Sequence, residues 1–475
     1  MSVAFENRLE VLRSNPRFSP ETVNRFVRFL QEAPEEALFR TSPMHFATTE
    51  GVPENEAIEL FLCATHAGIL EFTWGVLCPA CGSFLTTPAA LRSLQRERPC
   101  QMCRINVKTE DDNMEVAFSV APSARRIRFH QPEALDLRRD LLALMFSQSR
   151  TLSEEILRVV GDSVMDSIAL PPGGVHRFTA KIEAGKTYFL AVPLHHVYCE
   201  LDAVAEGGVR TVEAELMEDR LLPGYVKMNA GEVSVTLHNR TSSSVRVALV
   251  KFWISKSELV CDVSRMPPPV PFRPYLSGKR LVTNQTFREL FRAESIPSEG
   301  GLEFKSLTVL FTDLKGSTEM YERIGDFRAY GLVREHFGVL RDIIADRGGS
   351  LVKTIGDAVM ASFAEPMPAL EAATAMTREV RRVSRDGAQL QLKVGLHSGP
   401  CIAVELNERL DYFGQTVNVA ARVQGVAGAD EIAITEPVYT APGAQDVIRA
   451  ASLSASRERA LLKGVEGETT VYRLR

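Results

Sequence analysis

Two aspartates in the last third of the chain have the residue type and the surroundings of divalent-metal ligands. Asp313 follows an apolar run at 307–311 and precedes a turn of small residues that includes Gly316, Ser317 and Thr318. A carboxylate at a strand end can ligate Mg²⁺, and the free backbone N–H groups of such a turn can face an anion. The turn residues are therefore candidate ligands for phosphate oxygens.

The second aspartate is Asp357, which follows Gly356 between two short apolar stretches at 349–355 and 358–363. This pattern is typical of a β-hairpin. If the hairpin lies beside the strand that ends in Asp313, the two carboxylates can hold two Mg²⁺ ions roughly 3.5–4 Å apart. Aspartate is also common after glycine in ordinary turns, so a purely structural role for both residues is the alternative.

Four of the eight cysteines form two close pairs. Two residues separate Cys78 from Cys81 and Cys100 from Cys103, with eighteen residues between the pairs. This spacing is typical of four-thiolate zinc sites and predicts a zinc ribbon at about 75–107 that holds one Zn²⁺ per chain. A closed four-sulfur site leaves no open position for a substrate, so the predicted role is structural. Four buried cysteines without metal are the alternative.

The elements that must position the two aspartates follow a recognisable order. We expect a strand at 306–312, a helix at 319–349, two strands at 349–355 and 358–363, a second helix at 366–387 and a further strand at 390–399. This β-α-β-β-α-β order predicts a ferredoxin-like α+β domain with a C-terminal extension. After the last strand, 411–414 is expected to be a connection, and Thr416 is expected to cap a further helix.

The long helix at 319–349 is expected to bury one face. Apolar residues recur along it at helical spacing, and Gly348 and Gly349 end it. The residues expected on the buried face are Met320, Ile324, Phe327, Tyr330, Phe337, Leu340 and Ile344.

The first 265 residues contain two different patterns. Helical periodicity, with Ser19 as an N-cap, dominates before the cysteines, whereas alternation of apolar and polar residues after them predicts a small antiparallel sandwich or barrel. His195, His196 and Cys199 lie close together in this β-rich region. No further ligand pairs with them, so an ordinary strand end is the preferred interpretation over a second metal site.

A chain of 475 residues is too long for one hydrophobic core and suggests about three domains. We expect an α+β protein of four regions. They are a helical region with the zinc ribbon at 1–113, a β-rich domain of regulatory function at 114–265, a proline-rich linker with a connecting helix at 266–302, and the α+β domain at 303–475.

Charge and hydropathy exclude several classes of protein. The net charge of −5 gives no general attraction to nucleic acid or to an anionic membrane. The N-terminus carries charges where a signal peptide needs an apolar core, and no apolar run approaches the roughly 18 residues of a membrane span. A cytoplasmic location is therefore expected. A nucleic-acid-binding ribbon is an alternative, because Arg92, Arg96, Arg98 and Arg104 lie near the cysteines, but no aromatic residues are interleaved with them.

Four blocks of the C-terminal region resemble the signature blocks of class III nucleotidyl cyclases, in that family's order. They are FTDLKGST, LVKTIGDAVM, KVGLHSGP and LDYFGQTVNVAAR. The resemblance covers about 303–475. It departs from the family pattern at Ser317, where an aromatic residue is common, and at Gln415, where an aspartate is common.

The resemblance implies a role for each matching residue. Asp313 and Asp357 match the two carboxylates that bind two Mg²⁺ or Mn²⁺ ions, and Leu314 matches a position that lends its backbone carbonyl to one metal. Lys353 and Asp411 match the pair that reads adenine, because an ammonium donates to a ring nitrogen and a carboxylate accepts from the 6-amino group. Asn418 matches a residue that orients the ribose, and Arg422 matches one that stabilises the phosphates. Lys393 and Lys463 match phosphate-contacting positions that are less constrained in the family.

By this resemblance the protein is expected to convert ATP into 3′,5′-cyclic AMP and pyrophosphate. Guanylate-specific members are expected to carry Glu and Cys at the base-reading positions. In the family, the metal carboxylates and the remaining residues come from different chains, so a homodimer with two composite sites is implied. The alternatives are a guanylate cyclase and a catalytically silent homologue that binds ATP. The chain contains neither a GGDEF motif nor a Walker-type phosphate loop.

Overall fold

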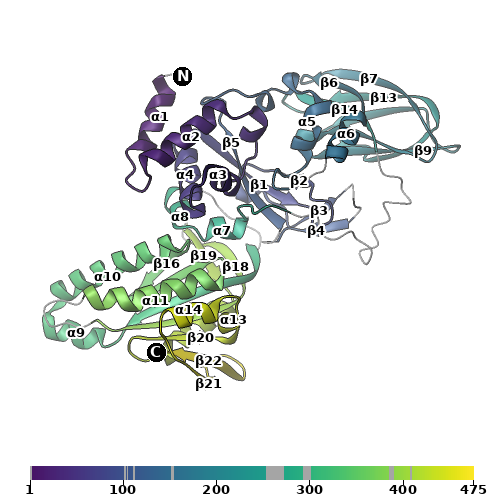
Figure 1. Cartoon of the computed structure of the whole chain (residues 1–475). Helices are drawn as coiled ribbons and strands as arrows, with labels where there is room; N and C mark the ends of the chain where they lie inside the picture. The colour runs from purple at the N-terminus through teal and green to yellow at the C-terminus, as the bar shows by residue number, and fades with distance from the viewer. Residues whose placement is uncertain are drawn as a thin grey trace. The chain divides into compact units, whose positions relative to one another are not determined.

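The computed structural model describes residues 3–100, 103, 105–110, 113–150, 154–252, 272–291, 301–383, 390–406 and 409–475 (Figure 1). Two parts of the linker expected at 266–302, namely 266–271 and 292–300, lie outside these residues, as do Arg104 and the side chain of Arg92. The chain divides into two compact units. One contains Asn113–Leu276 and nearly all residues before it, and the other contains Ser277–Arg475.

The N-terminal unit begins with four helices, α1 (Val3–Arg13), α2 (Pro20–Glu32), α3 (Pro43–Glu50) and α4 (Glu54–His66). The Ser19 side chain accepts a hydrogen bond from the backbone N–H of Thr22, which confirms the expected N-cap of α2. Helix α2 turns its apolar face, including Phe26 and Leu30, into the core.

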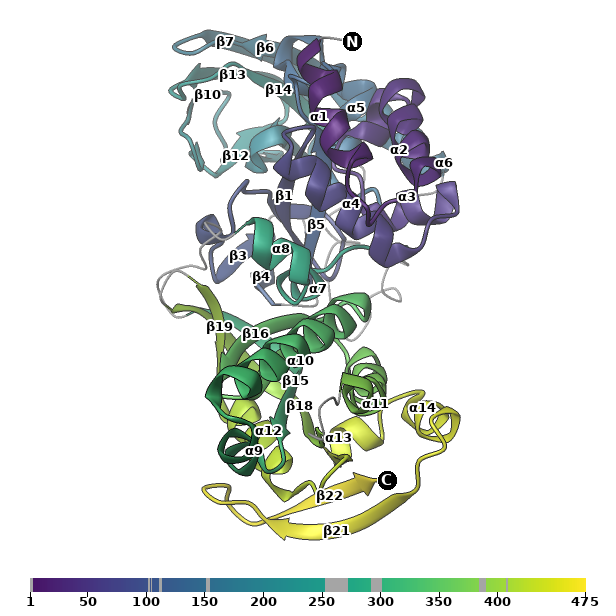
Figure 2. The same ribbon diagram turned by 90° about the vertical axis from the view of Figure 1, so that its left-hand side faces the viewer.

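These helices pack against a small sheet of three strands, in which β1 (Leu70–Leu77) lies between β2 (Phe84–Thr86) and β5 (Met114–Val120). Figure 2 shows α4 beside β1. The sequence placed strand 114–120 with the β-rich region, and this was wrong. Strand β5 pairs with β1 along its whole length, from Met114 opposite Val76 to Val120 opposite Leu70. The alternation within a strand does not say which distant strand it joins.

A two-stranded ribbon, β3 (Glu97–Cys100) with β4 (Ile105–Lys108), carries the second cysteine pair. Helices α5 (Leu137–Met145) and α6 (Glu154–Asp162) precede nine strands. The strands are β6 (Val164–Leu170), β7 (Val175–Ile182), β8 (Thr187–Val192), β9 (Val197–Val204), β10 (Thr211–Leu216), β11 (Leu221–Leu222), β12 (Tyr225–Asn229), β13 (Gly231–Asn239) and β14 (Val245–Lys251).

These strands form the expected sandwich. One sheet has the order β11-β10-β13-β7 and the other β12-β9-β8-β14-β6, and a single apolar core takes residues from both. Most neighbours are antiparallel, as expected, but β10 with β13 and β9 with β12 are parallel.

The C-terminal unit opens with two short helices, α7 (Gly278–Val282) and α8 (Gln285–Leu290). The elements that follow are β15 (Leu302–Leu314), α9 (Ser317–Ile324), α10 (Asp326–Asp346), β16 (Ser350–Ile355), β17 (Ala358–Phe363), α11 (Pro366–Val383), β18 (Leu392–Leu406), β19 (Arg409–Phe413) and α12 (Gln415–Val426). The expected β-α-β-β-α-β order is confirmed.

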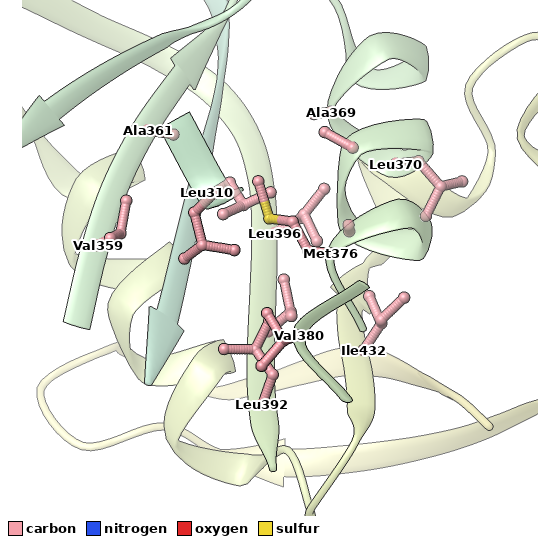
Figure 3. Packing of buried hydrophobic residues seen from close by; sticks show 14 of the residues in the cluster. Leu310, Val359, Ala361, Ala369, Leu370, Met376, Val380, Leu392, Leu396 and Ile432 are labelled. Carbon is pink, nitrogen blue, oxygen red and sulfur yellow. The ribbon is translucent and has the colours of Figure 1, made fainter. Parts of the chain in front are cut away.

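One sheet of order β16-β17-β15-β18-β20-β22-β21 organises this unit, and β19 pairs with β18 beside it. Its last three strands are β20 (Glu431–Thr435), β22 (Glu468–Leu474) and β21 (Ala455–Leu461). Helices α10 and α11 lie side by side on one face (Figure 1). Their apolar residues pack on inward-facing side chains of the central strands, such as Leu310, Leu392 and Leu396 (Figure 3). This core fixes β15 and β17 as neighbours.

Helix α12 covers the other face of the sheet and lies against β18 and β15. The approach is closest at Gly395 of β18, where an added Cβ would lie 2.1 Å from the backbone nitrogen of Gln424. Only glycine allows this contact, so Gly395 sets the distance between α12 and the sheet.

The expected long helix at 319–349 is wrong in one respect. It breaks at Gly325, whose φ of 80° belongs to the left-handed side of backbone space, into α9 and α10. The break shifts the helical phase, so α10 buries Ala329, Val333, His336, Leu340 and Ile344. Phe327 and Tyr330, which were expected in the core, are 91% and 62% exposed.

Two expectations after the last strand of this order also fail. Residues 411–413 are not a connection but belong to β19, which pairs with the extended end of β18. Thr416 lies inside α12, and Gly414, with a φ of 139°, precedes the helix. The Thr416 hydroxyl donates instead to the carbonyl of Pro400 at 2.6 Å, which ties the helix start to β18.

The chain ends with β20 (Glu431–Thr435), α13 (Glu436–Tyr439), α14 (Ala444–Ala450), β21 (Ala455–Leu461) and β22 (Glu468–Leu474). Strand β20 joins the sheet parallel to β18, and β21 and β22 form an antiparallel hairpin. None of the helices within the described residues is long and apolar enough to cross a membrane.

Candidate functional site

The sheet brings Asp313 and Asp357 to one place. Thr312 of β15 pairs with Val359 of β17, and the Thr312 hydroxyl accepts a hydrogen bond from the Val359 N–H at 3.2 Å. Asp313 is therefore the next residue along β15, and Asp357 lies in the turn that leads into β17. Burial raises the pKa of Asp313 above its usual range, and the charge of Asp357 raises it further.

The surroundings of this carboxylate pair fit a hard cation. The Oδ2 atom of Asp357 is buried and has no hydrogen-bond partner among the described residues. Lys393 of β18 lies opposite Asp313 in the ladder, and its charge only partly offsets the repulsion by lowering the pKa of Asp313. Two carboxylates with an adjacent backbone carbonyl, that of Leu314, are the oxygen ligands that Mg²⁺ and Mn²⁺ prefer.

The turn after β15 has the expected form. Gly316 adopts a φ of 72° and precedes α9, so the helix begins at Ser317. Ser317 is half-buried, and Gly316 and Thr318 are exposed. The N-terminus of α9 therefore presents backbone N–H groups beside the carboxylate pair, where a negatively charged group would be stabilised.

Lys353 and Asp411 meet although their positions in the sequence differ by 58. Lys353 Nζ on β16 lies 2.6 Å from Asp411 Oδ2 on β19, with the lysine side chain 41% exposed and the aspartate 9%. The other carboxylate oxygen of Asp411 accepts a hydrogen bond from the backbone N–H of Tyr412 at 2.8 Å. The two side chains offer a donor and an acceptor side by side.

The sequence did not indicate how the α7–α8 segment contacts these strands. The Gln285 side-chain oxygen accepts from the N–H of Leu351 on β16 at 2.8 Å, and Arg288 Nη2 donates to the carbonyl of Leu410 on β19 at 2.6 Å. The Tyr412 hydroxyl donates to the carbonyl of Val282 at 3.2 Å. The segment thus holds both strands that carry the Lys353–Asp411 pair. A connecting helix was expected here, but these contacts are long-range and leave no local pattern.

Asn418 and Arg422 are both exposed on α12, one turn apart, whereas Val419 and Val423 are buried. Neither Asn418 nor Arg422 has a hydrogen-bond or ion-pair partner in the described part of the chain. Lys463 is exposed in the turn between β21 and β22. These three side chains are free to contact a ligand or a second protein chain.

His336 is a polar residue near the site that the sequence analysis did not single out. Its side chain is fully buried on α10, and neither ring nitrogen has a hydrogen-bond partner among the described residues. Burial lowers the pKa of His336 to about 4, although the negative charge of Asp357 acts to raise it. The ring is therefore neutral at physiological pH. Helical spacing alone could have marked it as a core position.

The four cysteines of the N-terminal unit also meet. Their Sγ atoms all lie within 4.8 Å of one another, and no other group of this kind occurs among the residues that the structure describes. The Sγ atoms of Cys81 and Cys100 are 3.8 Å apart, the separation expected at a tetrahedral zinc with Zn–S bonds of about 2.3 Å. His195, His196 and Cys199 form no such group.

We expect the purified protein to contain one tightly held zinc per chain, because four clustered thiols otherwise leave buried polar sulfur without a cation. Cys100→Ser should remove most of the zinc and lower the melting temperature of the N-terminal unit. Metal analysis of the two proteins checks this, with Cys63→Ser, outside the cluster, as the control. A zinc-free wild-type protein that unfolds cooperatively would contradict the assignment.

Comparison with known proteins locates two families in the chain. A family of unknown function (DUF5939) matches residues 3–289, and the adenylate and guanylate cyclase catalytic domain matches residues 302–475. The two matches divide the chain close to the boundary between its compact units.

Characterised relatives match parts of the chain. The pH-sensitive adenylate cyclase MT1302 of Mycobacterium tuberculosis is 31% identical over 184 residues, 39% of this chain and 43% of that protein. Guanylate cyclase 32E of Drosophila melanogaster is 29% identical over 150 residues, 29% of this chain and 13% of that protein. The chain thus spans less than half the length of the curated relatives it matches. Among solved structures, the adenylyl cyclase CyaB from P. aeruginosa is 24% identical, over 36% of this chain and 94% of that one, with a TM-score of 0.32.

Proposed function

The chain belongs to the family of unknown function (DUF5939) and ends in a class III adenylate/guanylate cyclase catalytic domain, and from this premise we propose that it converts ATP into 3′,5′-cyclic AMP and pyrophosphate. The observation that carries the proposal is the Asp313–Asp357 pair, two neighbouring carboxylates with a buried oxygen that lacks a partner. Two divalent ions bound there, Mg²⁺ or Mn²⁺, would lower the pKa of the ribose 3′-hydroxyl and neutralise the triphosphate.

The other residues are proposed to have the roles that the resemblance to class III cyclases implies. The ribose 3′-oxygen attacks the α-phosphorus and pyrophosphate leaves. Arg422 stabilises the charge that develops on the α-phosphoryl group, and Asn418 aligns the ribose. The turn of Gly316, Ser317 and Thr318 offers backbone N–H groups to phosphate oxygens. Lys393 and Lys463 are further candidate phosphate ligands, of which Lys393 lies beside Asp313.

The Lys353–Asp411 pair supports ATP rather than GTP. Adenine has a ring nitrogen that accepts a hydrogen bond and an amino group that donates one, and the paired ammonium and carboxylate are complementary to this edge. Guanine carries an oxygen in place of the 6-amino group. A carboxylate facing that oxygen would be repelled.

We propose that the active form is a homodimer in which each site takes residues from both chains. Asn418 and Arg422 are exposed and have no partner in the described part of their own chain, as expected if they serve a site completed by a second copy. Apolar residues on neighbouring strands are also exposed, with Ile402 on β18 directly opposite Phe413 on β19. Such a patch favours association with an identical surface.

The direct test of the activity is an assay of the purified chain with Mg²⁺ or Mn²⁺ and either ATP or GTP. Cyclic AMP should be the main product. If only cyclic GMP forms, the assignment of ATP as the substrate is wrong. If no cyclic nucleotide forms, the proposed cyclase activity is wrong.

Exchange of the base-reading pair should weaken the use of ATP. In the double variant Lys353→Glu, Asp411→Cys, the adenine edge loses both of its partners. The ratio of kcat/KM for ATP to that for GTP should fall by about 10- to 100-fold, the cost of leaving polar groups unpaired. Competition between the two nucleotides in one reaction measures the ratio. An unchanged ratio would exclude this pair from base recognition.

We also propose that the N-terminal unit regulates the site through the α7–α8 segment, because this segment holds β16 and β19 by hydrogen bonds. Arg288→Met removes the bond to β19 and should raise the KM for ATP about 2- to 10-fold, with the metal dependence unchanged. Arg341→Met, an exposed arginine on α10, is the matched control. If the two variants have equal KM values for ATP, the α7–α8 segment does not influence the site.

A further inference from the structure

Asp313 points toward the face of the sheet that α12 covers. Leu310 and Leu314, on the same strand, pack into the core under α10 and α11. Successive side chains of a strand point to opposite faces of a sheet, so the Asp313 side chain, one position before Leu314, points away from that core. Helix α12 lies against β15 and β18 on the other face. The Asp313 carboxylate and α12 therefore share one side of the sheet.

The residue of α12 at its closest approach to the sheet is Gln424. A Cβ added at Gly395 of β18 would lie 2.1 Å from the backbone nitrogen of Gln424 and 2.6 Å from its Cβ. Gly395 lies opposite Phe311 in the ladder between β18 and β15, and Asp313 is two residues further along β15 on the same face. The side chain of Gln424 is therefore anchored within reach of the Asp313 carboxylate.

The side-chain amide of Gln424 faces this carboxylate. Its Nε2 atom is buried and has no hydrogen-bond partner of ordinary geometry among the described residues. Burial raises the pKa of the Asp313 carboxyl, and the Gln424 amide acts as a hydrogen-bond donor that lowers it. The amide is therefore close enough to act on the carboxyl, although the hydrogen bond between them is not fully closed.

The chemistry of the two groups favours a closed hydrogen bond when a metal ion is bound. A buried N–H without an acceptor is costly, and hydrogen bonds to an ionised carboxylate are shorter and stronger than those between neutral groups. The amide oxygen of Gln424 would be repelled by the carboxylate, so the nitrogen is the atom that faces it. Hydrogen bonds at functional sites are often long without ligand and tighten when the ligand binds.

We propose that Gln424 is a positioning residue for the metal site: its side-chain N–H donates to one carboxylate oxygen of Asp313 and leaves the other oxygen directed at the divalent ion. Groups that hydrogen-bond to a metal ligand orient it, and their loss weakens metal binding. Gln424 is uncharged, so unlike Lys393 it holds the carboxylate without repelling the ion. The inference rests on the proposed metal site and adds a residue whose effect passes through Asp313.

Binding of Mn²⁺ to the full chain tests the proposal, because the electron paramagnetic resonance signal of free Mn²⁺ gives the bound fraction directly. Methionine has nearly the length and volume of glutamine but no donor, so Gln424→Met should raise the dissociation constant for Mn²⁺ by about 10-fold or more. Gln445→Met, at an exposed glutamine on α14, is the matched control and should bind Mn²⁺ as the wild type does. Asp313→Asn should lose this binding.

The melting temperature without added Mn²⁺ separates positioning from a purely structural role. It should not fall in Gln424→Met, because the change removes a buried donor that has no closed hydrogen bond. If Gln424→Met binds Mn²⁺ as tightly as the wild type, the positioning role is wrong although the metal site stands. If Asp313→Asn also binds Mn²⁺ as the wild type does, the metal assignment itself is wrong, and the role of Gln424 with it. None of these outcomes depends on cyclase activity.

Discussion

Asp313→Asn is expected to reduce cyclic nucleotide formation by at least about 100-fold, because a metal site that loses one of two carboxylates no longer stabilises the transferring phosphoryl group. The same change should leave the metal-free protein as stable as the wild type or more stable. Burial and Asp357 raise the pKa of Asp313, so the folded protein favours the protonated carboxyl, which an amide resembles.

The difference in stability between the wild type and Asp313→Asn should depend on pH. A raised pKa means that the contribution of Asp313 to stability is present at low pH and is lost as the pH rises through its pKa, which lies above the ordinary value of 3.8. The variant should therefore melt at the same temperature as the wild type in acid and at a higher temperature near neutrality.

Melting curves without metal and with added Mg²⁺ measure both properties. Mg²⁺ should raise the melting temperature of the wild type but not that of the variant. Asp342→Asn, an exposed aspartate on α10, is the matched control and should behave as the wild type. Activity that survives in Asp313→Asn would refute the metal assignment.

Arg422→Met is expected to lower kcat by about 10²–10³-fold, the usual cost of removing one group that stabilises charge in a transition state. The side chain is exposed on α12 and has no ion-pair partner in the described part of the chain, so the melting temperature should not change. The stabilisation by Mg²⁺ should also persist, because the carboxylate pair is intact.

A matched control for this variant is Arg378→Met, an exposed arginine on α11. Steady-state kinetics with ATP separates the two. If Arg422→Met and Arg378→Met have the same kcat, Arg422 does not act on the phosphoryl group.

The sequence predicted the C-terminal fold well because its elements are strongly patterned. Apolar strands, a Gly-Asp turn and paired prolines mark most of the boundaries. The hairpin that carries Asp357 lies beside β15 as expected, since a two-residue turn leaves β16 and β17 little freedom. Cys78, Cys81, Cys100 and Cys103 also meet as their spacing predicted.

The failures have physical causes that a single sequence does not reveal. The predicted buried face assumes one continuous helix through Gly325. The backbone leaves the helix at that residue, so Phe327 and Tyr330 are exposed. Strand β5 has an ordinary alternating pattern, which does not state that its partner is β1. The contacts of Gln285 and Arg288 join residues far apart in the chain, and such pairs leave no local pattern.

We propose that one active site takes its carboxylates from one chain and Arg422 from another. Asp313→Asn and Arg422→Met, coexpressed with different affinity tags and purified as the mixed dimer, test it most directly. One of the two sites then combines intact carboxylates with an intact arginine, so the mixed dimer should recover about half of the wild-type activity per dimer, although each parent is inactive. A mixed dimer as inactive as both parents would contradict the claim.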